Sequence, residues 1–423
     1  MRSSNSSAAN DFPHPPPAGV EVGAGGVFFF ERVSYNIQMS SRNAASAVVI
    51  AFLLSAFAPM LPAQTPTAAD AIALERQGNL QRAAQAWQTI TEQNPDDAGA
   101  FASLGVVLSK ETRYAEAAAA YHKAVALNPK LPGVQLDLGL AEFKQGHFGA
   151  AIQPLRTALA ANPGDMQATT LLGLSYYGAK RFADAAKYLS AAAASDPANT
   201  QLHQTLAQSC LLAKQYSCAL VEFRKLQQLN PNSWAVHMLT GEALDGQHRT
   251  AEAIEEFQRA VSLAPRQPNL NFSLGFLYWK TQQFDKASAA FSAELAIVPG
   301  NAQALAYLGD IAMQQGNDAK ALPLLRKAVG LQNDNRLVYL DMGTILMDQK
   351  KYPEALVSLR RAVQIDPDQS DAHFRIGRIE QIMGNAAAAQ KEFAIVRELR
   401  QKENQDLAAK ASKHLRSPNQ PQP

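Results

Sequence analysis

A period of 34 residues runs through most of this chain. Alanine recurs at this spacing in an unbroken series: Ala83, Ala117, Ala151, Ala185, Ala219, Ala253, Ala287, Ala321, Ala355 and Ala389. Proline keeps the same spacing, with Asn333 in the one missing place: Pro95, Pro129, Pro163, Pro197, Pro231, Pro265, Pro299 and Pro367. A fixed period indicates one structural element repeated along the chain, so length alone does not give the number of domains.

Each period predicts a hairpin of two helices. It contains two apolar stretches whose residues are three and four apart, the spacing of an amphipathic helix. The proline follows the second stretch, where a residue without an N–H and with a fixed φ ends a helix. A glycine recurs in the first stretch, with Ala207 in one place: Gly105, Gly139, Gly173, Gly241, Gly275, Gly309, Gly343 and Gly377. Glycine costs about 1 kcal/mol relative to alanine inside a helix, so its recurrence indicates a packing reason. We expect the two helices of each hairpin to cross closely where this glycine faces the alanine of the series.

The repeat resembles that of the tetratricopeptide repeat (TPR) family, which carries Trp, Leu-Gly, Tyr, Ala, Phe, Ala and Pro at fixed positions. In the repeat that begins at Ala98 these positions hold Phe101, Leu104, Gly105, Leu108, Ala117, Tyr121, Ala124 and Pro129. The repeat that begins at Pro268 matches as well, but Glu294 replaces an alanine, and we expect looser packing there. The resemblance implies an all-α fold, an α-solenoid of helix-turn-helix TPR hairpins. These would stack into a right-handed superhelix with the first helices on its concave face.

The repeats set the expected domain boundaries. Nine TPR repeats cover residues 98–400, and a degenerate repeat without the glycine covers residues 65–97. Residues 401–416 turn strongly polar and predict a C-terminal capping helix, because an uncapped end of a repeat array would associate with other chains. Residues 1–38 and 417–423 lack an apolar period, and we expect both segments to be disordered.

Residues 39–64 have the layout of a signal peptide. Arg42 precedes an uncharged apolar run over residues 44–61, and small and polar residues follow, so we expect cleavage near Ala63. A retained membrane anchor is the main alternative, because about eighteen apolar residues are the lower limit for crossing a bilayer. An internal helix is the third interpretation of this run.

The signal-like segment also bears on the first residue and on localisation. It begins unusually far from Met1, which indicates that Met39 is the true start. With Arg42 held inside, a cleaved signal and an anchor both place the repeats across the membrane, in the periplasm or outside the cell. We therefore expect an exported protein that touches the membrane only through an uncleaved anchor.

Charge and motifs exclude several classes of function. The net charge is +2, from 39 basic and 37 acidic residues, so we expect no attraction to nucleic acid or to an anionic membrane surface. His203, His237 and His373 all occupy the fourth position of their repeats, where the family places a packing residue. Packing is the preferred interpretation and metal ligation the alternative, since no ligand motif is present. We expect no metal, no cofactor and no enzymatic activity.

Two cysteines lie in one predicted hairpin. Cys210 and Cys218 stand on either side of its turn, where antiparallel helices bring residues together. In an oxidising compartment they would form a disulfide, worth about 2.5 kcal/mol for so short a loop. Two reduced cysteines packed inside a tight hairpin are the equal alternative.

The fifth, ninth and twelfth positions of each first helix predict a peptide-binding groove, because they point away from the packing positions. The first apolar patch contains Leu136, Leu140, Phe143, Leu174 and Tyr177. The second apolar patch contains Phe272, Phe276 and Trp279. The polar groove residues are Gln204, Gln208, Glu242, Asp245 and Asp310. The alternative is that these aromatic rings pack between neighbouring repeats.

The groove composition favours a binding protein. Basic residues at the groove positions are nearly absent apart from Arg378, which argues against capture of a chain-terminal carboxylate. We expect a non-catalytic exported scaffold that binds a protein or peptide partner, for assembly of an envelope or secretion complex. An accessory subunit of polysaccharide synthesis or glycan transfer is the alternative. An enzyme would need an acid–base pair from Glu242, Asp245 and Asp310.

Overall fold

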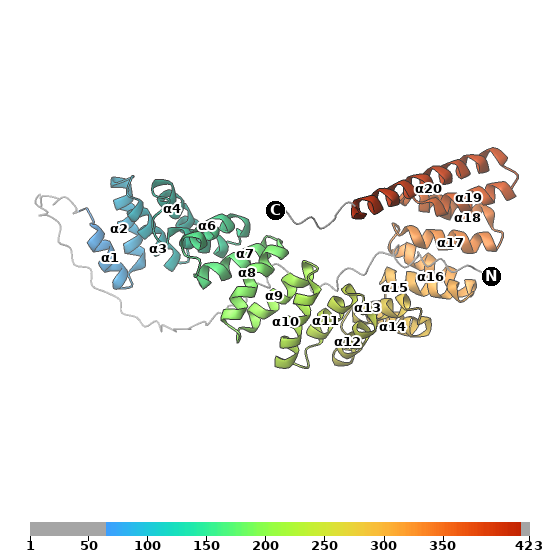
Figure 1. The fold of residues 1–423 in the computed structure, drawn as a ribbon, viewed down its shortest axis with the longest axis horizontal. Coiled ribbons are helices and arrows are strands. Elements are labelled where there is room, and N and C mark those ends of the chain that lie inside the picture. The colour runs from blue at the N-terminus through green and yellow to red at the C-terminus, as the bar shows by residue number, and fades with distance from the viewer. Residues whose placement is uncertain (1–64, 416–423) are drawn as a thin grey trace, which may run out of the picture. The chain divides into compact units, whose positions relative to one another are not determined.

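The computed structural model describes residues 65–415 (Figure 1). These residues form helices joined by short turns, with no strand among them. The segments expected to be disordered at both chain ends and the signal-like segment 39–64 lie outside the described residues. No helix within residues 65–415 has the length and apolar character needed to cross a membrane.

The described chain divides into two compact units, one ending at Pro231 and the other beginning at Asn232. The N-terminal unit contains α1 (Ala68–Arg76), α2 (Leu80–Gln93), α3 (Ala98–Lys110), α4 (Tyr114–Leu127), α5 (Val134–Lys144), α6 (Phe148–Ala161), α7 (Met166–Gly178), α8 (Phe182–Ser195), α9 (Thr200–Leu212) and α10 (Tyr216–Leu229). The C-terminal unit contains α11 (Trp234–Gly246), α12 (Thr250–Leu263), α13 (Leu270–Lys280), α14 (Phe284–Ile297), α15 (Ala302–Gln314), α16 (Asp318–Leu331), α17 (Arg336–Asp348), α18 (Tyr352–Ile365), α19 (Ser370–Ile382) and α20 (Ala386–Leu415).

Each predicted repeat is a helical hairpin, as the all-α interpretation required (Figure 1). The odd-numbered helix of each pair is the first helix and the even-numbered helix is the second. Many first helices begin after a side chain that accepts a backbone N–H, as Asp97 does from Ala100 at 3.0 Å and Asn301 from Ala304 at 3.0 Å. Such caps satisfy N–H groups that have no partner in the first turn. Second helices end two residues before the recurring proline, as α4 ends at Leu127.

The recurring glycine makes room for a large side chain from the second helix. A Cβ on Gly105 would lie 2.5 Å from the ring of Tyr121, and a Cβ on Gly173 would lie 2.8 Å from Leu189. The close crossing predicted from the glycine is therefore present, but its main partner is the residue sixteen positions later. The alanine of the predicted series lies beside this contact, since the carbonyl of Ala253 is 3.3 Å from a Cβ placed on Gly241.

Neighbouring first helices lie side by side within each unit. Each one packs on its own second helix, and several also contact the first helix of the next repeat, as α5 does with α7 and α15 with α17. Within each unit, the residues predicted to line the groove therefore lie on a layer of first helices. We call its outer surface the first-helix face.

The alanine position of the repeat that begins at Pro268, where we expected looser packing, holds a hydrogen-bonded glutamate. Glu294 is fully buried, and its carboxylate accepts the backbone N–H of Asn269 at 2.9 Å and that of Phe272 at 3.3 Å. Pro268 and the left-handed Asn269 delay the start of α13, which has no cap from its own side chains. Glu294 supplies that cap from the neighbouring helix α14.

The predicted boundary between the last repeat and a capping helix is not a break in the structure. One helix, α20, runs from Ala386 to Leu415 and contains both the second helix of the last repeat and the polar extension. The position where earlier repeats carry proline holds Gln401 here, which donates a backbone N–H and continues a helix. The C-terminal extension therefore grows directly out of the last hairpin.

Candidate functional site

The first apolar patch lies on α5 and α7 of the N-terminal unit. All five of its side chains are half-buried. Phe143 meets Phe148 edge to face at 5.5 Å between ring centroids, and Tyr177 meets Phe182 at 5.8 Å. The Tyr177 hydroxyl donates to Gln208 of the next repeat at 2.8 Å. Burial raises the pKa of Tyr177, so this hydroxyl stays protonated and able to donate at neutral pH.

An open hollow of about 400 Å³ adjoins this patch at Leu140. Its lining residues are Leu140, Met166, Gln167, Thr170, Leu171, Ala192, Ser195, Asp196, Asn199 and Leu202. They come from α5, α7, the end of α8 and the start of α9, all within the N-terminal unit. The hollow was not predicted from the sequence, although Ser195 differs from the leucine or isoleucine at its position in most other repeats.

The second apolar patch lies on α13 of the C-terminal unit and is buried. Phe272, Phe276 and Trp279 are 2%, 3% and 8% exposed. Tyr307 of the next repeat contacts all three, with centroid distances of 5.9, 5.8 and 5.1 Å. The sequence left two interpretations of these rings open, a peptide-binding groove and packing between neighbouring repeats. Their burial supports packing.

Buried carboxyl groups border the second patch. Asp310 is 3% exposed, and its Oδ2 accepts the indole N–H of Trp279 at 2.6 Å. Burial raises the pKa of Asp310, and the hydrogen bonds from Trp279 and Gln314 partly oppose this shift. On the next first helix, Oδ2 of Asp341 is buried and accepts no hydrogen bond within the described chain. Burial, with the nearby charge of Asp310, raises the pKa of Asp341 well above its ordinary value.

The remaining polar groove residues differ in their surroundings. Gln204 is exposed and Glu242 is half-buried. Asp245 accepts Nζ of Lys280 at 2.8 Å and the hydroxyl of Thr250 at 3.0 Å. Asp245 and Asp310, two of the three candidates for acid–base chemistry, are thus each held in hydrogen bonds that connect helices.

The three histidines at the fourth position each pair with a glutamate of the same hairpin. His237 Nδ1 lies 2.6 Å from Glu256, and His373 Nδ1 lies 2.6 Å from Glu392. His203 pairs with Glu222 in the same way, and both side chains are buried. The packing interpretation of these histidines agrees with this geometry.

Sequence alone contained a signal for these pairs. Among the nine repeats from residue 98 onward, glutamate occupies position 23 only in the three repeats that have histidine at position 4. The spacing of nineteen residues is constant. A search for residues that change together between repeats would have predicted the contacts.

Two further histidines share one glutamate in the N-terminal unit. His122 and His147 lie 3.0 Å from opposite oxygens of Glu142. The imidazoles are largely exposed and Glu142 is buried. Within residues 65–415 no group of three or more His, Cys, Asp and Glu side chains is arranged to hold a metal ion.

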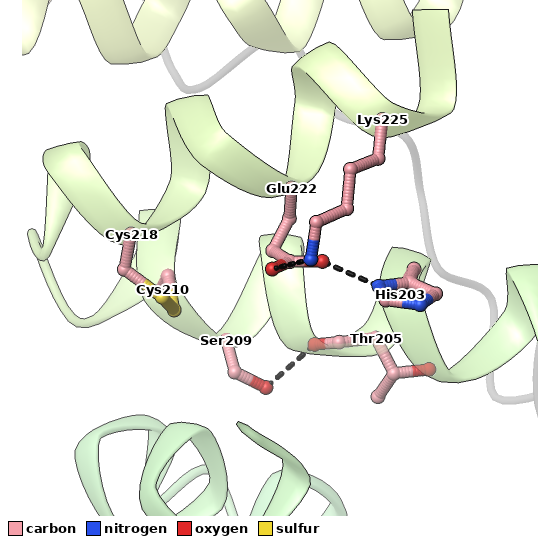
Figure 2. The surroundings of a disulfide bond; sticks show 7 residues. All are labelled: His203, Thr205, Ser209, Cys210, Cys218, Glu222 and Lys225. Atoms are coloured by element: carbon pink, nitrogen blue, oxygen red, sulfur yellow. Dashed lines mark hydrogen bonds and ion pairs between the residues drawn. A yellow bond between two sulfur atoms is a disulfide. The ribbon is translucent and has the colours of Figure 1, made fainter. Parts of the chain in front are cut away.

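Cys210 and Cys218 form a disulfide between α9 and α10, which resolves the two alternatives left by the sequence (Figure 2). Their Cα atoms are 5.8 Å apart, inside the usual range for a disulfide. The buried pair of His203 and Glu222 lies in the same hairpin (Figure 2). This is also the repeat in which Ala207 replaces the recurring glycine.

Comparison with solved structures gives several similar folds. MamA is 18% identical over 39% of this chain and 96% of its own, with a TM-score of 0.37. YrrB, described as a TPR protein with an unusual peptide-binding site, is 20% identical over 45% of this chain and 97% of its own, with a TM-score of 0.38. PilF of Pseudomonas aeruginosa is 17% identical over 50% of this chain and 97% of its own, with a TM-score of 0.43.

Comparison with protein families and with curated sequences gives the family. No curated protein matches the chain significantly. Family models described as tetratricopeptide repeat match residues 69–132, 136–200 and 272–336, and residues 176–243. A model described as TPR repeat matches residues 343–379. These matches extend from the first hairpin to the last first helix, and the chain belongs to the tetratricopeptide repeat family.

Proposed function

We propose that this protein is an exported, non-enzymatic scaffold that binds a protein or peptide partner on the first-helix face of its N-terminal unit. The observation that carries the proposal is the first apolar patch, whose five side chains remain half-exposed on neighbouring first helices. Half-buried leucine and aromatic side chains on a rigid helical layer suit an extended partner with apolar anchors. The scaffold would serve assembly of an envelope or secretion complex.

The charge around the patch supports a partner recognised mainly by apolar contacts. The groove positions of α5 and α7 carry no charged side chain. Gln204 and Gln208 on the adjacent α9 supply amide groups that suit hydrogen bonds with a peptide backbone. A few buried anchors, each worth about 2 kcal/mol or more, provide most of the affinity in such interfaces.

The disulfide supports the exported location. Disulfides persist in oxidising compartments and are rare where thiols are kept reduced. The bond between Cys210 and Cys218, together with the signal-like layout of residues 39–64, favours a periplasmic or extracellular protein. Membrane attachment would then depend on whether that segment is removed.

Site-specific photo-crosslinking in the native envelope tests the binding proposal. A photoreactive amino acid would replace Leu174 on the first-helix face in one variant and the exposed Lys187 on the second helix α8 in the matched control. We expect a defined partner band from position 174 and none from position 187. Equal bands from both positions, or a band from position 187 alone, would contradict binding on the first-helix face.

A further inference from the structure

One position near the end of the second helix distinguishes two adjacent repeats from all the others. Position 30 of the nine repeats holds leucine or isoleucine seven times: Leu127, Leu229, Leu263, Ile297, Leu331, Ile365 and Leu399. The two exceptions are Ala161 and Ser195. A serine at this point removes most of the side-chain volume that a leucine would place there.

The open hollow lies beside this serine. Ser195 is one of its lining residues, whereas Ala161 is not. The Ser195 hydroxyl donates back to the carbonyl of Ala192 at 2.8 Å, so its side chain turns to its own helix. The leucines at this position in four other repeats are 40–62% exposed, so a leucine in place of Ser195 would lie at the rim of the hollow.

Five of the ten residues that line the hollow are apolar: Leu140, Met166, Leu171, Ala192 and Leu202. Leu171 and Leu202 are each 9% exposed, and Leu140 of the first apolar patch is half-buried. Met166 is 41% exposed, and its flexible thioether side chain can adapt to an occupant. A volume of about 400 Å³ falls within the usual range of ligand pockets and accommodates one large side chain with its backbone.

The polar groups of the hollow are mostly satisfied by the protein itself. The Thr170 hydroxyl donates to the carbonyl of Met166 at 2.7 Å. Asn199 caps α9 through the N–H of Leu202 at 3.1 Å and donates to Asp196 at 3.1 Å. Asp196 is the one charged residue in the lining, and neither lysine nor arginine is present there. The lining therefore combines apolar side chains with polar groups, and Asp196 supplies its single carboxylate.

We infer that this hollow is an anchor pocket for one large apolar side chain of a partner segment that carries a basic residue next to that anchor. The inference rests on the proposed function and extends it by giving the chemistry of the partner. The apolar side chain would contact Leu140, Leu171 and Leu202. The adjacent lysine or arginine would face Asp196. Continuity through Leu140 places the pocket at the edge of the first apolar patch.

Filling the hollow tests the inference with a built-in control for folding. In Ser195→Leu the repeat receives the residue that most other repeats carry, so we expect an unchanged melting temperature. Ala161→Leu, at the same position of the preceding repeat but outside the hollow, is the matched control. The probe is N-acetyl-leucyl-lysine amide, and binding is followed by NMR of the methyl groups of Met166 and the lining leucines in the full chain.

We expect the probe to shift these methyl signals in the wild type and in Ala161→Leu, and to bind about tenfold more weakly to Ser195→Leu. In Asp196→Asn, the preference for this probe over N-acetyl-leucyl-glutamate amide should disappear. Equal binding to Ser195→Leu and wild type, or no methyl shifts in the wild type, would overturn the inference. An equal response of the wild type to the two probes would contradict the claim that the partner carries a basic residue next to its anchor.

The same variants separate this inference from the proposed function. If the crosslinked partner binds Ser195→Leu as tightly as it binds the wild type, the hollow is not its anchor pocket. Binding of the partner on the first-helix face would then still hold. If photo-crosslinking at position 174 captures no partner but the probe binds, the pocket is present and the proposed scaffold function fails.

Discussion

The N-terminal unit carries Leu140 and Leu174 at the ninth position of α5 and α7, where both are half-buried, whereas the C-terminal unit carries Phe276 at the same position of α13, fully covered. The twelfth position shows the same contrast between Tyr177 and Trp279. Both units share one repeat frame and one helical hairpin. The two units differ in how deeply the side chains at the ninth and twelfth positions of their first helices are buried.

The contrast shows that an outward position of a first helix in a solenoid can either pack into the core or stay partly exposed. In the C-terminal unit, Tyr307 brings a large ring onto its neighbours Phe272, Phe276 and Trp279, and the face becomes part of the core. In the N-terminal unit, Phe143 and Tyr177 contact Phe148 and Phe182 of their own hairpins, and the patch stays half-buried. This contrast supports a structural role for the second patch and agrees with the binding role that we propose for the first.

The largest expected effect comes from emptying the buried patch. Phe272→Ala should lower the free energy of unfolding by about 3–5 kcal/mol, because it leaves a cavity among packed rings. Phe143→Ala in the half-exposed patch should cost about 1–2 kcal/mol, since less of its area is removed from water. Urea unfolding with hydrogen exchange of α13 and α5 measures both. Equal losses in the two variants would remove the distinction between the units.

Removing the disulfide should have the next largest effect. The double substitution of Cys210 and Cys218 by serine should lower the stability of the α9–α10 hairpin by about 2.5 kcal/mol, because a short loop in the unfolded chain is no longer closed. Hydrogen exchange of α9 and α10 reports the loss, and reductant should add nothing further in the variant. If hydrogen exchange of α9 and α10 is the same in the variant as in the wild type, the disulfide does not stabilise this hairpin.

Restoring the family alanine at position 294 should destabilise the C-terminal unit. Glu294→Ala removes the acceptor of two backbone N–H groups at the start of α13, one of them buried, which costs about 1–3 kcal/mol. Asn301→Ala removes the cap of the next first helix and should cost about 1 kcal/mol. Thermal melting compares the two. A more stable Glu294→Ala would support the looser packing that the sequence led us to expect.

The last effect depends on pH and comes from the carboxyl group of Asp341, whose Oδ2 is buried. Its pKa is raised by burial, so the folded chain keeps this proton to a higher pH than the unfolded chain does. The stability from this group is full below the ordinary Asp pKa and is lost as pH rises toward the folded value, by at most about 1.4 kcal/mol per pH unit. Asp341→Asn should be more stable than wild type at neutral pH, with a flatter pH profile of unfolding. A less stable variant would contradict this account.

Much of the fold followed from the period of the sequence. The prolines predicted where second helices end, and the glycines predicted the helix crossings, because both residues act through local backbone geometry. The buried cap from Glu294 was not predictable in this way, since it depends on a left-handed start of α13 and a contact between helices. The burial of the second patch was left open between a groove and packing, because it depends on the neighbouring ring of Tyr307 and not on the residues of α13 alone.

The most direct test of the contrast is partner binding by two matched variants. Once photo-crosslinking has identified the partner, its dissociation constant would be measured for wild type, for the double variant Leu136→Ala/Phe143→Ala, and for Phe272→Leu, which keeps an apolar side chain in the buried patch. We expect at least about tenfold weaker binding for the first-patch variant, with a folded C-terminal unit, and unchanged binding for Phe272→Leu. Binding that survives in the first-patch variant but is lost in Phe272→Leu would place recognition on the C-terminal unit and contradict the assignment.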